Sequence, residues 1–214
     1  MDEVKNVEKL AIENSNIAKD EDLTATEMKL SAKHEVKRAK AREMLVKNEI
    51  ELAKIRERLA EKAKKLVERK EKVKDIMKFS GENLKAEKNQ AIYNEKLSDI
   101  QIKIAEIQRK IANVENEIAE VKIKLADKKR DEAKGRTNLA KKQFAYVKLV
   151  NNNAPGEKVT KAEEAYLKQQ RELTKYETDA MEINKDIVEQ QNKLADLKKE
   201  LSEKLTEREK IRPA

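Results

Sequence analysis

The feature that most constrains the fold of this chain is a regular apolar column between Tyr93 and Leu125. Its members alternate at intervals of four and three residues, without a polar interruption: Tyr93, Leu97, Ile100, Ile104, Ile107, Ile111, Val114, Ile118, Val121 and Leu125. Because an α-helix returns to the same face every 3.6 residues, this alternation is typical of a coiled-coil seam. It predicts a long helix that packs along much of its length against another helix.

A column of small residues runs beside this seam at intervals of seven. It consists of Ala105, Ala112, Ala119, Ala126, Ala133 and Ala140. Small side chains let another helix approach closely, so we expect the seam to face one helix and the alanine column to receive another. The seam weakens between residues 128 and 136, where Lys128, Glu132 and Gly135 take its positions. This interval predicts a bend or a local docking point.

An earlier stretch carries a broader apolar stripe. Leu45, Leu52, Leu59, Leu66 and Val73 repeat every seven residues, and Val46, Ala53, Ala60 and Val67 lie beside them. A two-column seam suits one partner, whereas a broader stripe suits a helix that lies against two neighbours. We therefore expect this stripe to be covered by two helices.

Turn signals are few, because the chain has only 3 Gly and 2 Pro. Residues 79–83, which include Gly81 and Asn83, form a plausible turn, and residues 151–156 form a clearer loop. Thr24 with Glu27, and Thr160 with Glu163, have the spacing of helix capping boxes. The expected helices therefore cover residues 24–79, 84–150 and 157–212.

These patterns predict an all-α fold, an elongated antiparallel coiled coil of three long helices. Residues 24–212 would form one body, preceded by an acidic N-terminal leader, residues 1–23. A helical hairpin that dimerises is the alternative, because it needs nearly the same pattern of apolar residues.

Composition argues against catalysis. Charged residues make up 43% of the chain, there is no Cys, and His34 is the single histidine. A zinc site needs several nitrogen or sulfur ligands, and a nucleophilic triad needs a shaped pocket. No phosphate-binding glycine motif occurs. We expect a non-enzymatic protein with no catalytic, cofactor-binding or metal-binding residues and no small-molecule substrate.

The sequence also bears on the location of the protein. No apolar run approaches the roughly 20 residues that cross a bilayer, and the first residues lack the basic and apolar regions of a signal peptide. A soluble cytoplasmic protein is the expectation, with a peripheral position at a membrane as the alternative.

Charge is distributed unevenly along the chain. Residues 24–79 hold 18 Lys and Arg against 10 Asp and Glu, whereas residues 1–23 hold 3 against 7. The candidate face for an acidic partner or an anionic membrane consists of Lys37, Arg38, Lys40, Arg42, Lys62, Lys64, Lys65, Arg69 and Lys72. Such residues are equally typical of an ordinary solvated helix surface. Nucleic-acid binding is disfavoured, because Tyr93, Tyr166 and Tyr176 occupy seam positions rather than alternating with the basic residues.

The functional expectation is a structural or scaffolding coiled-coil protein that self-assembles or docks along a larger complex. The alternative is a peripheral membrane-binding or membrane-shaping protein that uses its basic helical face. In its general plan of three long antiparallel helices with a basic face, the chain resembles BAR-type modules. This resemblance concerns architecture and implies binding to anionic bilayers.

Overall fold

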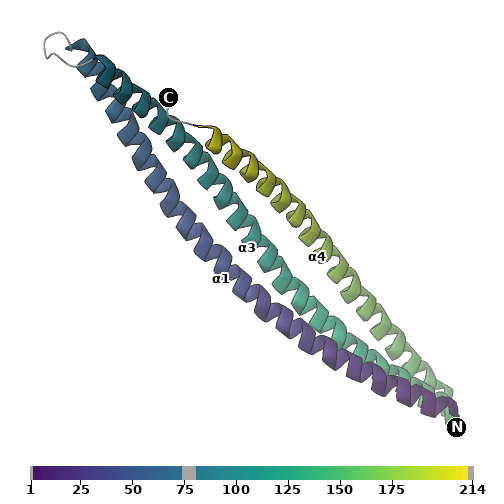
Figure 1. Ribbon diagram of the computed structural model, residues 1–214. Coiled ribbons are helices and arrows are strands. Elements are labelled where there is room, and N and C mark those ends of the chain that lie inside the picture. Colours follow the sequence, from purple (N-terminus) through teal and green to yellow (C-terminus); the bar gives the residue numbers. More distant parts are fainter. Residues whose placement is uncertain (1, 74–80, 212–214) are drawn as a thin grey trace. The chain divides into compact units, whose positions relative to one another are not determined.

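A computed structural model describes residues 2–73 and 81–211. Three long helices follow one another: α1 (Asp2–Lys72), α3 (Gly81–Asn151) and α4 (Gly156–Lys210) (Figure 1). Over the described residues every regular element is helical. The predicted all-α fold with three long helices is confirmed.

The predicted start of the first helix is wrong, because α1 begins at Asp2 and includes the described part of the leader. The Thr24 hydroxyl donates a hydrogen bond of 2.9 Å to the backbone oxygen of Asp20, one turn earlier. Thr160 bonds to the backbone oxygen of Gly156 in the same way, inside α4. In the middle of a helix, a Thr hydroxyl can donate a hydrogen bond to the carbonyl oxygen four residues earlier, so it does not need an N-cap position. The two capping-box assignments are therefore wrong as well.

The connections between helices are only partly described. Residues 74–80 lie outside the described residues, and so do residues 79 and 80 of the predicted turn at 79–83. α3 already begins at Gly81, which places Asn83 inside the helix rather than at its N-cap. The C-terminal limit predicted for the third helix, residue 212, also lies outside the described residues.

The predicted loop at 151–156 is confirmed, and its geometry is that of a Schellman motif. Asn153 has φ of 48°, the left-handed conformation common at helix C-termini. The amide of Asn153 donates to the carbonyl of Val150, and the amide of Ala154 donates to the carbonyl of Leu149, both at 3.1 Å. These bonds satisfy the last carbonyls of α3.

The described chain forms two compact units, whereas sequence reasoning treats residues 24–212 as one body. The first unit comprises residues 1–36 and 117–190, and the second comprises residues 37–116 and 191–214. Since the limits of both units fall inside helices, each helix contributes a segment to both.

In the first unit, α3 packs antiparallel to both other helices. Ion pairs join α1 to α3 in descending against ascending order: Glu35 to Lys122 at 2.7 Å, Asp22 to Arg130 at 2.9 Å, and Glu21 to Arg136 at 2.6 Å. Against α4, the seam residue Leu125 forms a buried cluster with Ala180 and Ile187, and Val121 and Ile183 pack against it. The seam therefore faces the third helix in this unit, as predicted.

The second unit has the same antiparallel pairing between α1 and α3. Arg42 lies 2.6 Å from Glu115, Lys64 lies 3.0 Å from Glu95, and Lys88 lies 3.3 Å from Glu71. Seam residues such as Ile104 and Ile107 are buried here as well.

Small residues form the contact between α1 and α3 in each unit. On α3 the predicted alanine column is buried throughout, and on α1 a matching column is buried at the same spacing of seven: Ala18, Ala25, Ala32, Ala39, Val46, Ala53, Ala60 and Val67. Ala18 and Ala133 line one groove in the first unit, and Ala60 and Ser98 line another in the second. Two antiparallel columns with one period stay in register, so small residues meet small residues along both segments.

Candidate interaction surface on the first helix

Among the described residues, α1 carries a column of exposed leucines, here called the leucine column. It consists of Leu45, Leu52, Leu59 and Leu66, whose exposed fractions are 64%, 54%, 60% and 55%. The expectation that two helices cover the broad stripe is wrong for these residues. Only the neighbouring column of Val46, Ala53, Ala60 and Val67 is buried.

The close packing of α1 against α3 explains why the leucine column is exposed. The column of Val46, Ala53, Ala60 and Val67 faces α3, because small residues permit the shortest approach. Each leucine precedes a member of that column by one residue and is therefore rotated about 100° away around the helix. The leucines are left beside the contact instead of inside it.

Grooves of the second unit adjoin the leucine column. Leu52 lines a groove of about 390 Å³ together with Ile104 of α3 and Leu205 of α4. Leu59 lines a neighbouring groove of about 460 Å³ with Leu97 of α3. Monomeric proteins seldom expose a long apolar surface of this kind unless something binds to it.

Some of the basic residues nominated from the sequence are engaged within the chain. Arg42 and Lys64 pair with Glu115 and Glu95 of α3. The hydrogen bond with Glu95 raises the pKa of Lys64 above its ordinary value. Lys65 pairs with Glu61 at 2.6 Å, and that hydrogen bond lowers the pKa of the Glu61 carboxyl.

The other nominated residues are exposed and form no ion pair with any described residue. They are Lys37, Arg38, Lys40, Lys62, Arg69 and Lys72. They do not share one face. Arg38 lies seven residues before Leu45 and therefore on the face of the leucine column, whereas Lys40, two residues later, lies about 200° further around the helix.

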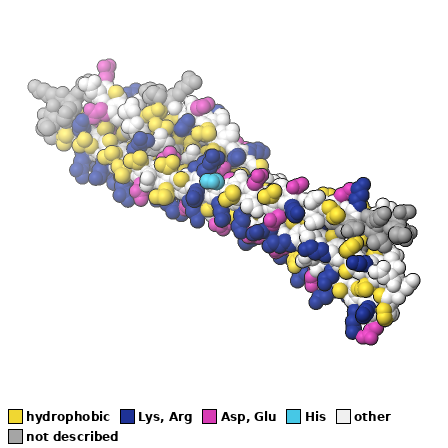
Figure 2. Space-filling view, turned by 90° about the horizontal axis from the view of Figure 1, so that it is seen from below, with side chains coloured by type: hydrophobic (Ala, Val, Ile, Leu, Met, Phe, Trp, Pro, Cys, Tyr) yellow, Lys and Arg dark blue, Asp and Glu magenta, His cyan; other side chains and the backbone are white. Residues whose placement is uncertain are grey.

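Helical spacing brings five basic positions of α1 onto one face. Arg58, Lys62, Lys65, Arg69 and Lys72 follow one another at intervals of four and three, and we call them the basic stripe. Sequence reasoning missed Arg58, although its spacing from Lys62 was visible. Figure 2 shows hydrophobic side chains reaching the surface among Lys and Arg side chains.

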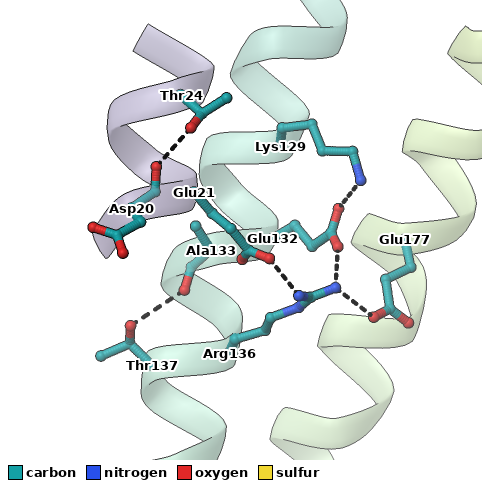
Figure 3. Close-up of polar contacts among 9 residues, drawn as sticks. All are labelled: Asp20, Glu21, Thr24, Lys129, Glu132, Ala133, Arg136, Thr137 and Glu177. Carbon is teal, nitrogen blue, oxygen red and sulfur yellow. Dashed lines mark hydrogen bonds and ion pairs between the residues drawn. The ribbon is translucent and has the colours of Figure 1, made fainter. Parts of the chain in front are cut away.

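The interval 128–136 forms a polar layer within the first unit. Glu132, whose side chain is only 5% exposed, accepts hydrogen bonds from Lys129 at 2.7 Å and from Arg136 at 2.6 Å (Figure 3). Arg136 also lies 2.6 Å from Glu21 of α1 and 3.6 Å from Glu177 of α4. One guanidinium thus links all three helices.

The same interval is where α4 packs against α3. A Cβ atom placed on Gly135 would lie 3.3 Å from Cδ1 of Leu173 and 3.3 Å from Cδ2 of Tyr176. The glycine therefore makes room for two large side chains. Lys128 donates a hydrogen bond of 2.7 Å to Asp179, which raises the pKa of Lys128 and lowers that of Asp179. The predicted docking point is thus a contact with α4, and α3 continues through it.

Tyr146 and Tyr166 stack near the connection between α3 and α4, with ring centroids 6.3 Å apart and planes at 5°. Tyr93, Tyr166 and Tyr176 are all partly buried.

Among the described residues there is neither a candidate metal site nor a membrane-spanning helix. His34 is exposed (cyan in Figure 2). Across residues 2–73 and 81–211, no group of three or more His, Asp or Glu side chains is placed to hold a metal ion. None of the described helices has an apolar stretch sufficient to cross a membrane.

Comparison with known proteins adds no assignment. No family model matches the sequence, and no curated protein shows significant similarity to it. The case for function therefore rests on the surface of α1.

Proposed function

We propose that this protein is a non-enzymatic coiled-coil scaffold that docks another helix along the leucine column of α1. The docked helix belongs to a second copy or to a larger complex. The observation that carries the proposal is the exposure of four leucines at heptad spacing on one helix, all within the second unit. Such spacing is what a partner helix requires for knobs-into-holes packing.

The free energy gained by burying the leucine column supports a docking surface, but one to which neighbouring charges must also contribute. Burying a fully exposed leucine contributes about 1.5–3 kcal/mol, so four that are already about half buried contribute on the order of 5 kcal/mol. Association costs about 4–15 kcal/mol in lost freedom. The column is therefore a plausible centre of an interface, and neighbouring charges must supply the remainder.

The proposal predicts that polar replacement of the column prevents association. In the variant Leu52→Gln/Leu59→Gln/Leu66→Gln, the dissociation constant is expected to rise at least about tenfold, because the apolar contribution is lost. Sedimentation equilibrium over a wide range of protein concentration measures this change. The helical circular dichroism should be retained, since Gln is a good helix former and these positions are exposed.

The matched control is Met181→Gln/Val188→Gln, which changes exposed apolar residues of α4. This control should associate like the unmodified protein. A protein that stays monomeric at every concentration and retains no partner from native extract would contradict the scaffold function.

A second candidate function is peripheral binding to an anionic membrane. The basic stripe supports it, because most of its cations are exposed and lie next to exposed leucines, as in interfacial amphipathic helices. Cosedimentation with anionic vesicles at low and high salt tests it, and absence of binding at low salt would remove it.

A further inference from the structure

We propose that the partner of the leucine column is the acidic N-terminal part of α1 from a second copy of this chain. This inference rests on the proposed scaffold function and names the occupant of its docking surface. It uses one further observation, which is that a single face of α1 is acidic near its beginning and basic near its end.

The basic end has a four-three pattern along the leucine column. Ile55, Lys62 and Arg69 each stand three residues after a leucine of the column and four before the next apolar member. Leucines and these residues therefore alternate along one stripe, in the positions that form the seam of a coiled coil.

The acidic end repeats the pattern with opposite charge. Leu10 and Ile17 occupy the same helical phase as the leucine column, and their exposed fractions are 56% and 52%. Glu13 and Asp20 stand three residues after them, and Glu27 continues the series. Residues 10–27 thus offer two apolar knobs and three carboxylates on one stripe.

These charged groups are available for a partner. Lys62, Arg69, Glu13, Asp20 and Glu27 are exposed, and none forms an ion pair with a described residue. Figure 3 shows the difference between neighbours, because Glu21 points to Arg136 whereas the carboxylate of Asp20 points away from it. The internal contacts of the first unit therefore leave the outer carboxylates unused.

Charge also argues against other occupants. Pairing two leucine columns in parallel and in register would set Lys62 against Lys62 and Arg69 against Arg69, which is repulsive. A bilayer would satisfy the cations, but the groove shared by Leu52, Ile104 and Leu205 is concave and suits a helix better than a flat surface. The acidic segment of a second copy matches both the shape and the charge.

The test is a charge exchange between two variants of the full chain. Glu13→Lys/Asp20→Lys makes the acidic end basic, and Lys62→Glu/Arg69→Glu makes the basic end acidic. In either variant alone, the two ends that should meet carry like charges, so self-association is expected to weaken at least about tenfold. An equimolar mixture restores opposite charges across the contact, and its association should return to near the original level.

Sedimentation velocity at low and high salt measures these effects. Association of the unmodified protein should fall with added salt, because exposed charges are screened over about 10 Å at 0.1 M salt. The matched controls change charge equally at exposed positions of α4: Glu163→Lys/Glu164→Lys and Lys198→Glu/Lys199→Glu. Both controls should associate like the unmodified protein, and circular dichroism should show the same helicity in all variants.

Three results would overturn the inference. They are a mixture that fails to recover, controls that weaken association as much as the test variants, and a Lys62→Glu/Arg69→Glu variant that loses binding to anionic vesicles while its self-association is unchanged. If leucine replacement abolishes association whereas charge reversal has no effect, the scaffold function stands and this choice of partner is wrong. If the unmodified protein neither self-associates nor retains a partner, the scaffold function is wrong as well.

Discussion

Arg136 is the residue that best shows how α3 tolerates polar groups in its apolar seam. Its guanidinium meets carboxylates of α1, α3 and α4, and the most buried of these, Glu132, is also paired with Lys129. A buried carboxylate is costly unless it is paired and hydrogen-bonded. Here the partners are supplied, so the polar layer interrupts the seam without interrupting the helix.

Lys128 and Asp179 provide a prediction at the same scale. Their hydrogen bond lowers the pKa of Asp179 in the folded protein. The contribution of this pair to stability is therefore present above the unfolded pKa of about 3.9 and is lost as the pH falls through the lower folded value. Replacing Lys128 with Met should raise the folded pKa of Asp179 toward its ordinary value, as measured by NMR titration of its carboxyl group.

The control for this prediction is Lys124→Met, which removes an exposed lysine of α3 that makes no contact with Asp179. It should leave the pKa of Asp179 unchanged. An identical shift in both variants would assign the effect to net charge rather than to the hydrogen bond.

At the scale of the element, the identity of the small residues decides which face of α1 is buried. The leucine column is the more apolar of the two neighbouring columns, yet the column of Ala and Val is the one in contact with α3. Close approach favours small side chains, because dispersion contacts are lost as soon as the helix backbones separate. The most hydrophobic column of a helix is therefore not always its core.

Replacing a buried alanine with a larger residue tests whether the close approach of α1 and α3 depends on small side chains. Ala126 is 1% exposed, so Ala126→Leu must push α1 and α3 apart in the first unit. We expect the free energy of unfolding to fall by about 1–3 kcal/mol. Urea titration followed by circular dichroism measures the change.

Ala145→Leu is the matched control, because Ala145 lies on the same helix and is exposed. Its effect should stay within about 0.5 kcal/mol. Equal effects in the two variants would show that the alanine contact does not limit the approach of the helices.

The sequence pattern predicts much of the basic stripe, but it predicts a covered position for the leucine column, which the structure leaves exposed. The density of basic residues in the sequence points to Lys62, Lys65, Arg69 and Lys72, whereas Arg58 is recognised only by its spacing of four from Lys62. Arg42 and Lys64 were included although both are paired with α3. Whether a basic residue of α1 forms an ion pair depends on where α3 lies. The spacing of residues within α1 carries no information about that position.

At the scale of the whole molecule, the two compact units are built from different segments of the same three helices. Within each unit, the helix segments have their own packing contacts with one another. Polypeptides open locally in cooperative groups that follow their tertiary contacts. A substitution that weakens one unit is therefore expected to act mainly on that unit.

Hydrogen exchange tests this expectation with a pair of variants. Ala126→Leu lies in the first unit, and Ala105→Leu makes the same change at a buried alanine of the second. Each should accelerate amide exchange chiefly in the segments of its own unit, as followed by mass spectrometry of peptic peptides. Equal acceleration in both units would show that they open together.

The sequence by itself determined the presence of three long helices, the loop at 151–156, the seam that faces α4 and the alanine column on α3, but not where the first helix begins. These features follow from residue spacing and turn chemistry, which act over a few residues. Only the tertiary structure decided that α1 packs through its alanines and leaves its leucines exposed. The sequence pattern allowed either column to be the core, and the antiparallel match of small residues on α3 made the choice.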